Sequence, residues 1–108
     1  MPEFIYRVRH QGTGSVVEVS GDIDMSVHQQ LTEALEPLVA AGDVVLDCSQ
    51  VSFMDSMGLR VALSMVRQAE EVGTTFALVP SKAVSRVLEL AGVTEIFDIR
   101  DTVPSAAE

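Results

Sequence analysis

This chain of 108 residues is poor in cysteine, in aromatic residues and in positive charge. Its single cysteine, Cys48, excludes an internal disulfide and fits the reducing cytoplasm. Two histidines and one cysteine, far apart in the sequence, predict no structural zinc site. Seven Lys and Arg residues against sixteen Asp and Glu give a net charge of −9, which argues against binding to nucleic acid or to an anionic membrane.

Long hydrophobic runs are also missing. No apolar stretch approaches the roughly 18 residues of a membrane span, and the first residues lack the apolar core of a signal peptide. With 47% hydrophobic residues the chain can still bury a core, and its length is that of one domain. We therefore expect a single domain over residues 1–108, with a core of about 4–100 and a frayed polar tail at 101–108.

The hydrophobic pattern predicts alternating strands and helices. Paired strands are expected over 4–9 and 15–20, with a turn at 21–24, and buried strands over 44–47 and 74–79. A turn and a short apolar stretch at 51–54 should follow the first buried strand. Helices are expected over about 27–41, 57–72 and 82–91, and residues 96–99 as a last strand or a helix edge. Repeated helix crossovers between buried strands imply an α/β fold with a parallel or mixed sheet.

The helix boundaries carry specific expectations. Ser26 and Gln29 match a capping box for the first helix, and Ser56 and Ser81 are placed to cap the second and third helices. Pro37 lies inside the first helical pattern and should kink or split it, because an interior proline costs about 3 kcal/mol. The helices should end at Gly42, Gly73 and Gly92.

Residues 46–59 are the most informative segment, because they present Ser56 where the second helix begins. Its hydroxyl can be a helix cap, a nucleophile or a phosphorylation site. A nucleophile needs a nearby base and an oxyanion hole; only His10 and His28 are available and no G-x-S-x-G elbow exists, so no catalytic residue is assigned. A phosphate at Ser56 would lie beside the positive end of a helix dipole, which could accept it without unfolding.

Four residues near Ser56 have two readings each. Asp55 either positions the Ser56 hydroxyl or satisfies backbone N–H groups of the loop. Gly58 lets the backbone turn closely or lets a partner approach. Asp22 and Asp24 lie near Ser56 if the second and third strands are neighbours, but they can equally be turn and cap residues.

The second helix carries an apolar-to-small stripe beside its core face, formed by Met57, Val61, Ser64, Met65 and Gln68. A Met-containing strip at the edge of a helix suits protein recognition. The alternative is that the neighbouring helix buries it. Both interpretations remain open on the sequence alone.

Residues 51–59 resemble the STAS domain family, of the anti-sigma factor antagonist class, whose motif is D-x-S-x-V-x-F-x-D-S-[ST]-G-L. The matching positions are Asp47, Ser49, Val51, Phe53, Asp55, Ser56, Gly58 and Leu59. Residues 21–24 are similar to the family's G-x-[IL]-D turn, and residues 90–93 to the end of its third helix, so the resemblance covers about residues 4–100. Met57 departs from the motif and leaves Ser56 as the only hydroxyl in the loop.

The resemblance implies a mixed sheet of four to five strands with helices packed against it, and a function that is not catalytic and needs no cofactor. The unphosphorylated protein would bind an anti-sigma factor that is also a serine kinase of the GHKL type, and so free a sigma factor. The kinase would phosphorylate Ser56 and end the complex, and a PP2C-type phosphatase would restore it. The predicted partner-binding residues are Asp22, Asp24, Asp55, Ser56, Met57, Gly58, Val61 and Met65.

Two rival functions remain. One is a STAS subunit of another assembly, such as a lipid-transport ABC complex or a stressosome-like scaffold. The other is a small-ligand or nucleotide-binding sensor, which is disfavoured because the chain has neither a P-loop nor a G-x-G-x-x-G motif. The principal expectation is a cytoplasmic bacterial regulator that binds another protein.

Overall fold

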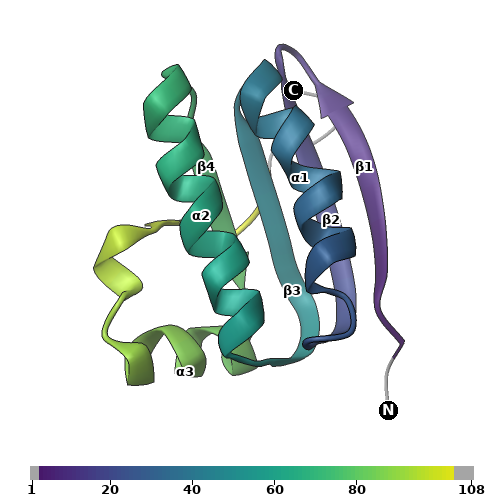
Figure 1. Cartoon of the computed structure of the whole chain (residues 1–108), viewed down its shortest axis with the longest axis vertical. Coiled ribbons are helices and arrows are strands. Elements are labelled where there is room, and N and C mark those ends of the chain that lie inside the picture. The colour runs from purple at the N-terminus through teal and green to yellow at the C-terminus, as the bar shows by residue number, and fades with distance from the viewer. Residues whose placement is uncertain (1–2, 104–108) are drawn as a thin grey trace.

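The computed structural model describes residues 3–103, which form one mixed sheet with three helices (Figure 1). In chain order the elements are β1 (Ile5–Gln11), β2 (Gly14–Ile23), α1 (His28–Ala41), β3 (Val44–Met54), α2 (Ser56–Val72), β4 (Phe76–Pro80), α3 (Lys82–Ala91), a 3₁₀ turn (Thr94–Ile96) and β5 (Asp98–Ile99). The spatial order of the strands is β1-β2-β3-β4-β5; β1 runs antiparallel to β2, and all other pairs are parallel. The predicted α/β fold with a mixed sheet is confirmed.

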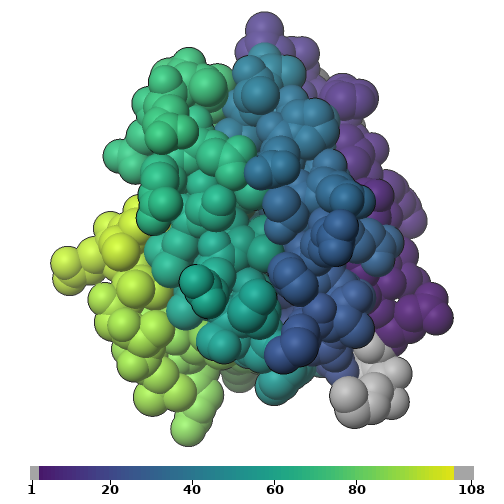
Figure 2. Space-filling view, in the orientation of Figure 1, coloured from purple at the N-terminus to yellow at the C-terminus, as the bar shows by residue number. Residues whose placement is uncertain are grey.

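The main core lies between the sheet and the helices. It takes Leu31 and Leu35 from α1, Met65 from α2 and Leu88 from α3, so all three helices cover the same face. Figure 2 shows α1 and α2 in contact along their length over that face. No helix within the described part of the chain is long and apolar enough to cross a membrane.

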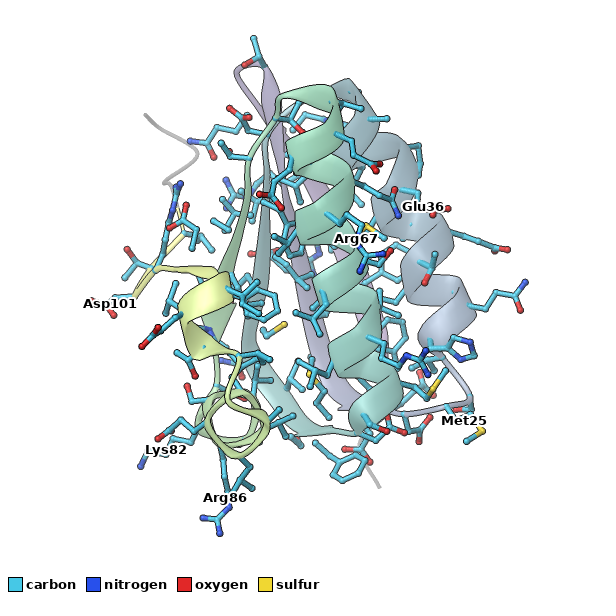
Figure 3. The ribbon with its side chains drawn as sticks, turned by 60° about the vertical axis from the view of Figure 1, so that its left-hand side comes forward. Met25, Glu36, Arg67, Lys82, Arg86 and Asp101 are labelled. Atoms are coloured by element: carbon cyan, nitrogen blue, oxygen red, sulfur yellow. The ribbon has the colours of Figure 1, made fainter. Side chains whose placement is uncertain are left out.

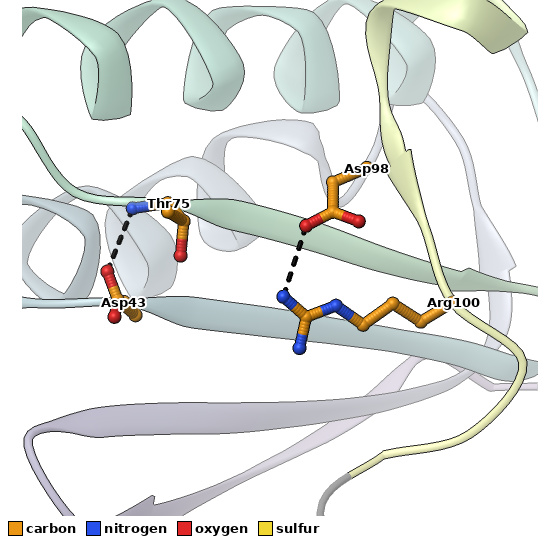
Figure 4. Close-up of polar contacts among 4 residues, drawn as sticks. All are labelled: Asp43, Thr75, Asp98 and Arg100. Carbon is orange, nitrogen blue, oxygen red and sulfur yellow. Dashed lines mark hydrogen bonds and ion pairs between the residues drawn. The ribbon is translucent and has the colours of Figure 1, made fainter.

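The opposite face of the sheet carries a second, smaller cluster. Its buried members are Val16, Val45, Ala77 and Val79, and Val103 packs against them. The segment from Arg100 to Val103, which follows β5, therefore reaches this face. The backbone N–H of Arg100 donates to the Leu78 carbonyl, and its guanidinium forms an ion pair with Asp98 at 3.1 Å (Figure 4).

The parallel strands β2, β3 and β4 end at one edge of the sheet, where the loops to the helices begin. Ile23 and Met54, the last residues of β2 and β3, are paired in register. The N–H of Asp55 then donates to the carbonyl of Ile23 at 3.1 Å, so the start of α2 is tied to the end of β2. At the other end of the sheet the Thr75 N–H donates to Asp43 Oδ1 at 2.9 Å (Figure 4).

The prediction of a turn at residues 21–24 is wrong, as is the break predicted between two apolar stretches at 44–54. β2 continues to Ile23, and β3 is one strand of 11 residues. Register shifts between Glu18 and Ser20, and between Gly21 and Asp22, let the two long strands stay paired. Gly21 has a φ of +89°, and a Cβ there would lie 2.1 Å from the carbonyl oxygen of Glu3. Glycine thus forms a bulge here instead of ending the strand.

The predicted capping box at the start of α1 is also wrong, and Pro37 does not split the helix. Its N-cap residue is Val27 without a side-chain hydrogen bond, and the Ser26 hydroxyl donates instead to Asp24 Oδ1. Pro37 lies inside α1 and does not split it. Pro37 and Glu33 are both exposed, so the Glu33 carbonyl that loses its helical partner can bond to water.

The other helix boundaries agree with the sequence. Ser81 Oγ accepts the N–H of Val84 and caps α3, as predicted. Gly73 and Gly92 follow α2 and α3 in the left-handed conformation. Residues 96–99 comprise the end of the 3₁₀ turn and the two-residue strand β5.

Candidate functional site

The start of α2 is held by Asp55, which is its N-cap residue. Asp55 Oδ1 accepts the backbone N–H groups of Met57 and Gly58, each at 3.0 Å. Ser56 is the first residue of the helix, so the prediction that Ser56 caps α2 is wrong. Of the two readings of Asp55, the structure supports the one in which its carboxylate satisfies loop N–H groups.

The Ser56 hydroxyl is exposed and makes no hydrogen bond within residues 3–103. Neither histidine serves it as a base. His10 Nδ1 lies 3.2 Å from Ser15 Oγ, and His28 Nδ1 lies 2.8 Å from the Met25 carbonyl. The hydroxyl is therefore free for an external enzyme and lacks the activation that a nucleophile requires.

Gly58 fixes how closely α2 approaches the sheet. A Cβ at this position would lie 2.8 Å from Ile23 Cγ2 and 2.9 Å from Met54 Cγ. The absence of a side chain therefore lets the first turn of α2 rest directly on the ends of β2 and β3. This contact and the Asp55 cap together hold Ser56 in one position at the surface.

The structure brings Asp22 and Asp24 to the same end of the sheet, because β2 and β3 are neighbours. Asp22 is only 8% exposed, lies beside Phe53 in register, and its carboxylate makes no hydrogen bond within the described chain. Its neighbour Ile23 belongs to the helix-side core, so the Asp22 side chain points to the opposite face. Asp22 is thus near the Ser56 loop along the sheet but faces away from α2.

Asp24 behaves as a turn residue. Its Oδ1 accepts both the N–H and the hydroxyl of Ser26. These two hydrogen bonds lower the pKa of Asp24 below its ordinary value, because they favour the charged carboxylate. The β2–α1 loop is therefore ordered by a local Asx-type turn.

Val61 and Met65 do not lie on a free surface, which corrects their prediction as partner-binding residues. Val61 is 6% exposed and Met65 is 0% exposed. The stripe to which they belong is the seam between α1 and α2, where Gln68 Nε2 donates to both Glu36 Oε2 and Ser64 Oγ at 3.1 Å. The alternative interpretation, burial by the neighbouring helix, is correct; Met57 remains half-buried at the end of the stripe.

Sequence reasoning missed two features of this end of the molecule. Met25, in the β2–α1 loop, is 67% exposed and points away from the helices (Figure 3), and Phe53, near the end of β3, is 48% exposed. Large apolar side chains this exposed beside a functional loop are typical of a protein contact. The outward face of α2 also holds a shallow hollow of about 260 Å³, lined by Arg60, Leu63, Ser64 and Arg67.

The described residues offer little for cofactor chemistry. No group of three or more His, Cys, Asp or Glu side chains within residues 3–103 is arranged to hold a metal ion. Cys48 is buried in the main core, and this burial raises the pKa of its thiol. The site in the described residues thus consists of the exposed Ser56 hydroxyl on a helix start held by Asp55 and Gly58.

Comparison with known proteins identifies the family to which this chain is similar. The family model described as "Mlab, STAS domain" matches residues 6–100. The chain is 34% identical over 88 residues to the anti-sigma-B factor antagonist of Listeria monocytogenes, covering 77% of this chain and 75% of that protein.

Two solved proteins share the fold. One is an anti-sigma factor antagonist from Mycobacterium paratuberculosis, with a TM-score of 0.84 and 29% identity over 97% of this chain and 92% of that one. The other is SpoIIAA, an anti-sigma factor antagonist, with TM-scores of 0.79 and 0.75 for its unphosphorylated and phosphorylated forms. Identity to these two forms is 21% and 20%; each match covers 95% of this chain, and 92% and 96% of SpoIIAA respectively.

Proposed function

Because the chain belongs to the STAS domain family, we propose that it is an anti-sigma factor antagonist switched by phosphorylation of Ser56. In its unphosphorylated form it binds an anti-sigma factor and so frees a sigma factor. The observation that carries this proposal is the Ser56 hydroxyl, exposed and without a hydrogen bond in the described chain, on a helix start held by Asp55 and Gly58. The 34% identity to a named antagonist supports the same function.

The partner surface consists of the loops at the carboxyl ends of β2 and β3. Ser56 and Met57 lie at its centre, with Met25 as the exposed apolar contact and Asp24 as a partly exposed charge beside it. Asp55 and Gly58 act indirectly, because both are occupied in holding the start of α2. Asp22 lies at the same end of the sheet but is only 8% exposed and faces away from α2, so it stays outside this surface.

Phosphorylation would act locally. A phosphate adds about −1.5 to −2 charges next to the Asp55 carboxylate, in a chain whose net charge is already −9. Burying that group against a partner costs free energy, and about 3–4 kcal/mol weakens binding by two to three orders of magnitude. SpoIIAA has been solved in both forms, each sharing this chain's fold, which supports a switch without refolding.

The catalytic groups for phosphoryl transfer would come from the partners. Asp55 is engaged with two N–H groups and neither histidine hydrogen-bonds Ser56, so the chain supplies only the acceptor hydroxyl. We infer an anti-sigma factor of the GHKL serine-kinase type as the phosphorylating partner and a PP2C-type phosphatase as its opponent. Such a system operates in the cytoplasm.

The test combines phosphate mapping with binding. Incubation with the candidate kinase and ATP should add one phosphate, located on Ser56 by mass spectrometry. Ser56→Ala should bind the kinase whether or not ATP is present, and Ser56→Asp should bind poorly. Thr13→Asp, which adds the same charge at the exposed turn between β1 and β2, is the matched control and should bind like wild type. If both Ser56 variants bound like wild type, the switch would not reside at this residue.

A second candidate is a STAS subunit of another assembly, such as a lipid-transport ABC complex. The name Mlab on the matching family model favours keeping it. The genes beside this one discriminate between the two functions, since a GHKL kinase gene supports the antagonist and a transporter ATPase gene supports the assembly subunit.

A further inference from the structure

Ser56 is followed on the same outward stripe of α2 by two arginines. At about 100° per residue, Ser56, Arg60, Leu63 and Arg67 fall within roughly 60° of one another around the helix axis. The buried residues Ala62, Met65 and Ala69 lie on the opposite side, facing the core, and Ser56, Arg60 and Arg67 are all exposed. Residues four positions apart on a helix face are neighbours, so Arg60 stands directly beneath Ser56.

Arg60 makes no ion pair and no hydrogen bond with the described residues 3–103. Arg60 is also the only basic residue between Ser56 and Val66. A guanidinium one turn below the serine is therefore available.

A phosphate on Ser56 would be stabilised by such a cation. The N–H groups of Met57 and Gly58, which would otherwise bind an anion, already donate to Asp55 Oδ1. The Asp55 carboxylate itself would repel the added charge. The first turn of α2 therefore has fewer free N–H groups to offer a phosphate, and a positive side chain nearby would add to the attraction of the helix dipole.

We propose that Arg60 binds the phosphate of phosphorylated Ser56 within the same chain. This rests on the proposed function, in which Ser56 is the phosphorylated residue. The planar guanidinium can donate two N–H groups to phosphate oxygens across one helical turn. Phosphorylation would then change the surface twice, by adding an anion and by withdrawing Arg60 from any acidic group of a partner.

The test uses protein carrying phosphoserine at position 56, incorporated during translation through an expanded genetic code, so that no kinase is needed. A ³¹P NMR titration measures the second pKa of the phosphate in three proteins: the otherwise wild-type chain, Arg60→Gln and Arg67→Gln. Arg60→Gln should raise that pKa by about 0.2–0.4 units, since removing a paired cation disfavours the dianion. Arg67→Gln, two turns beyond Arg60, is the matched control and should leave it nearly unchanged.

Two results would overturn the proposal. One is an equal second phosphate pKa in the wild-type and Arg60→Gln proteins. The other is an equal rise of that pKa in Arg60→Gln and Arg67→Gln, which would indicate the overall charge of the helix and not a specific pair between Arg60 and the phosphate. Failure of the proposed function is separate, because a kinase that does not modify Ser56 would leave this titration unaffected.

Discussion

Gly58 in α2 and Ile23 at the end of β2 are packed so closely that no side chain fits between them. A Cβ on Gly58 would lie 2.8 Å from Ile23 Cγ2. Ile23 is fully buried and cannot move aside without disturbing the core. Gly58 is not among the glycines with positive φ, so glycine is required here by packing and not by backbone conformation. This contact sets the position of the Ser56 hydroxyl.

Gly58→Ala should therefore destabilise the protein by about 1–3 kcal/mol, the usual cost of overpacking a core. The direction is informative, because alanine favours a helix over glycine by about 1 kcal/mol and would stabilise an unobstructed site. Urea denaturation of the two proteins measures the difference. Ser56→Ala, two residues away and exposed, should stay within about 0.5 kcal/mol of wild type. A Gly58→Ala protein as stable as wild type would refute the packing argument.

Asp55→Ala should cost about 1 kcal/mol of stability, because the N–H groups of Met57 and Gly58 lose their acceptor. Asp55→Asn keeps an oxygen at the same position and should retain most of that stability, since asparagine caps helices as well as aspartate does. Equilibrium denaturation of the three proteins separates the cap from the charge. A loss in Asp55→Asn equal to that in Asp55→Ala would mean that the negative charge, and not the hydrogen bonds, holds the helix start.

Cys48 should be inert in the folded protein. Its side chain is buried in the main core, and this burial raises the pKa of the thiol, so the reactive thiolate is scarce. Treatment with iodoacetamide near pH 8 should leave the native protein unmodified by mass spectrometry, and the same protein in urea should gain one adduct. Rapid alkylation under native conditions would show that the strand opens far more readily than its packing indicates.

The sequence was sufficient to predict the fold and the position of Ser56 at the start of α2. It was not sufficient to predict which residue caps that helix. Apolar periodicity and the glycines Gly73 and Gly92 located the ends of α2 and α3. Asp55 and Ser56 are adjacent residues that can both accept an N–H, so composition does not distinguish them as caps. The backbone decides: Asp55 is extended, with φ −97° and ψ −175°, and Ser56 is already helical.

The prediction that Val61 and Met65 of α2 bind a partner was wrong for a different reason. A helix that packs against both a sheet and a second helix is apolar over a wider arc than one that packs on a sheet alone. The sequence of α2 contains that arc. Only the packing of α2 against the sheet and against α1 shows that Val61 and Met65 are buried. Met25 was missed for the converse reason, since the exposure of a loop residue depends on neighbours that are remote in sequence.

Met25 and Met65 make a matched pair for separating partner binding from folding. Met65→Ala removes a fully buried side chain from the core and should destabilise the protein by about 2–5 kcal/mol. Met25→Ala removes a side chain that is 67% exposed and should change stability by less than about 0.5 kcal/mol.

Binding of the partner kinase should show the reverse order. Anchor residues of an interface contribute about 1 kcal/mol or more, so Met25→Ala should weaken binding by about fivefold or more if Met25 is such an anchor. Met65→Ala, measured below its melting temperature, should bind as wild type does, because its side chain does not reach the surface. Isothermal titration calorimetry of both variants checks this. Unchanged affinity in Met25→Ala would remove the β2–α1 loop from the partner surface and confine that surface to the start of α2.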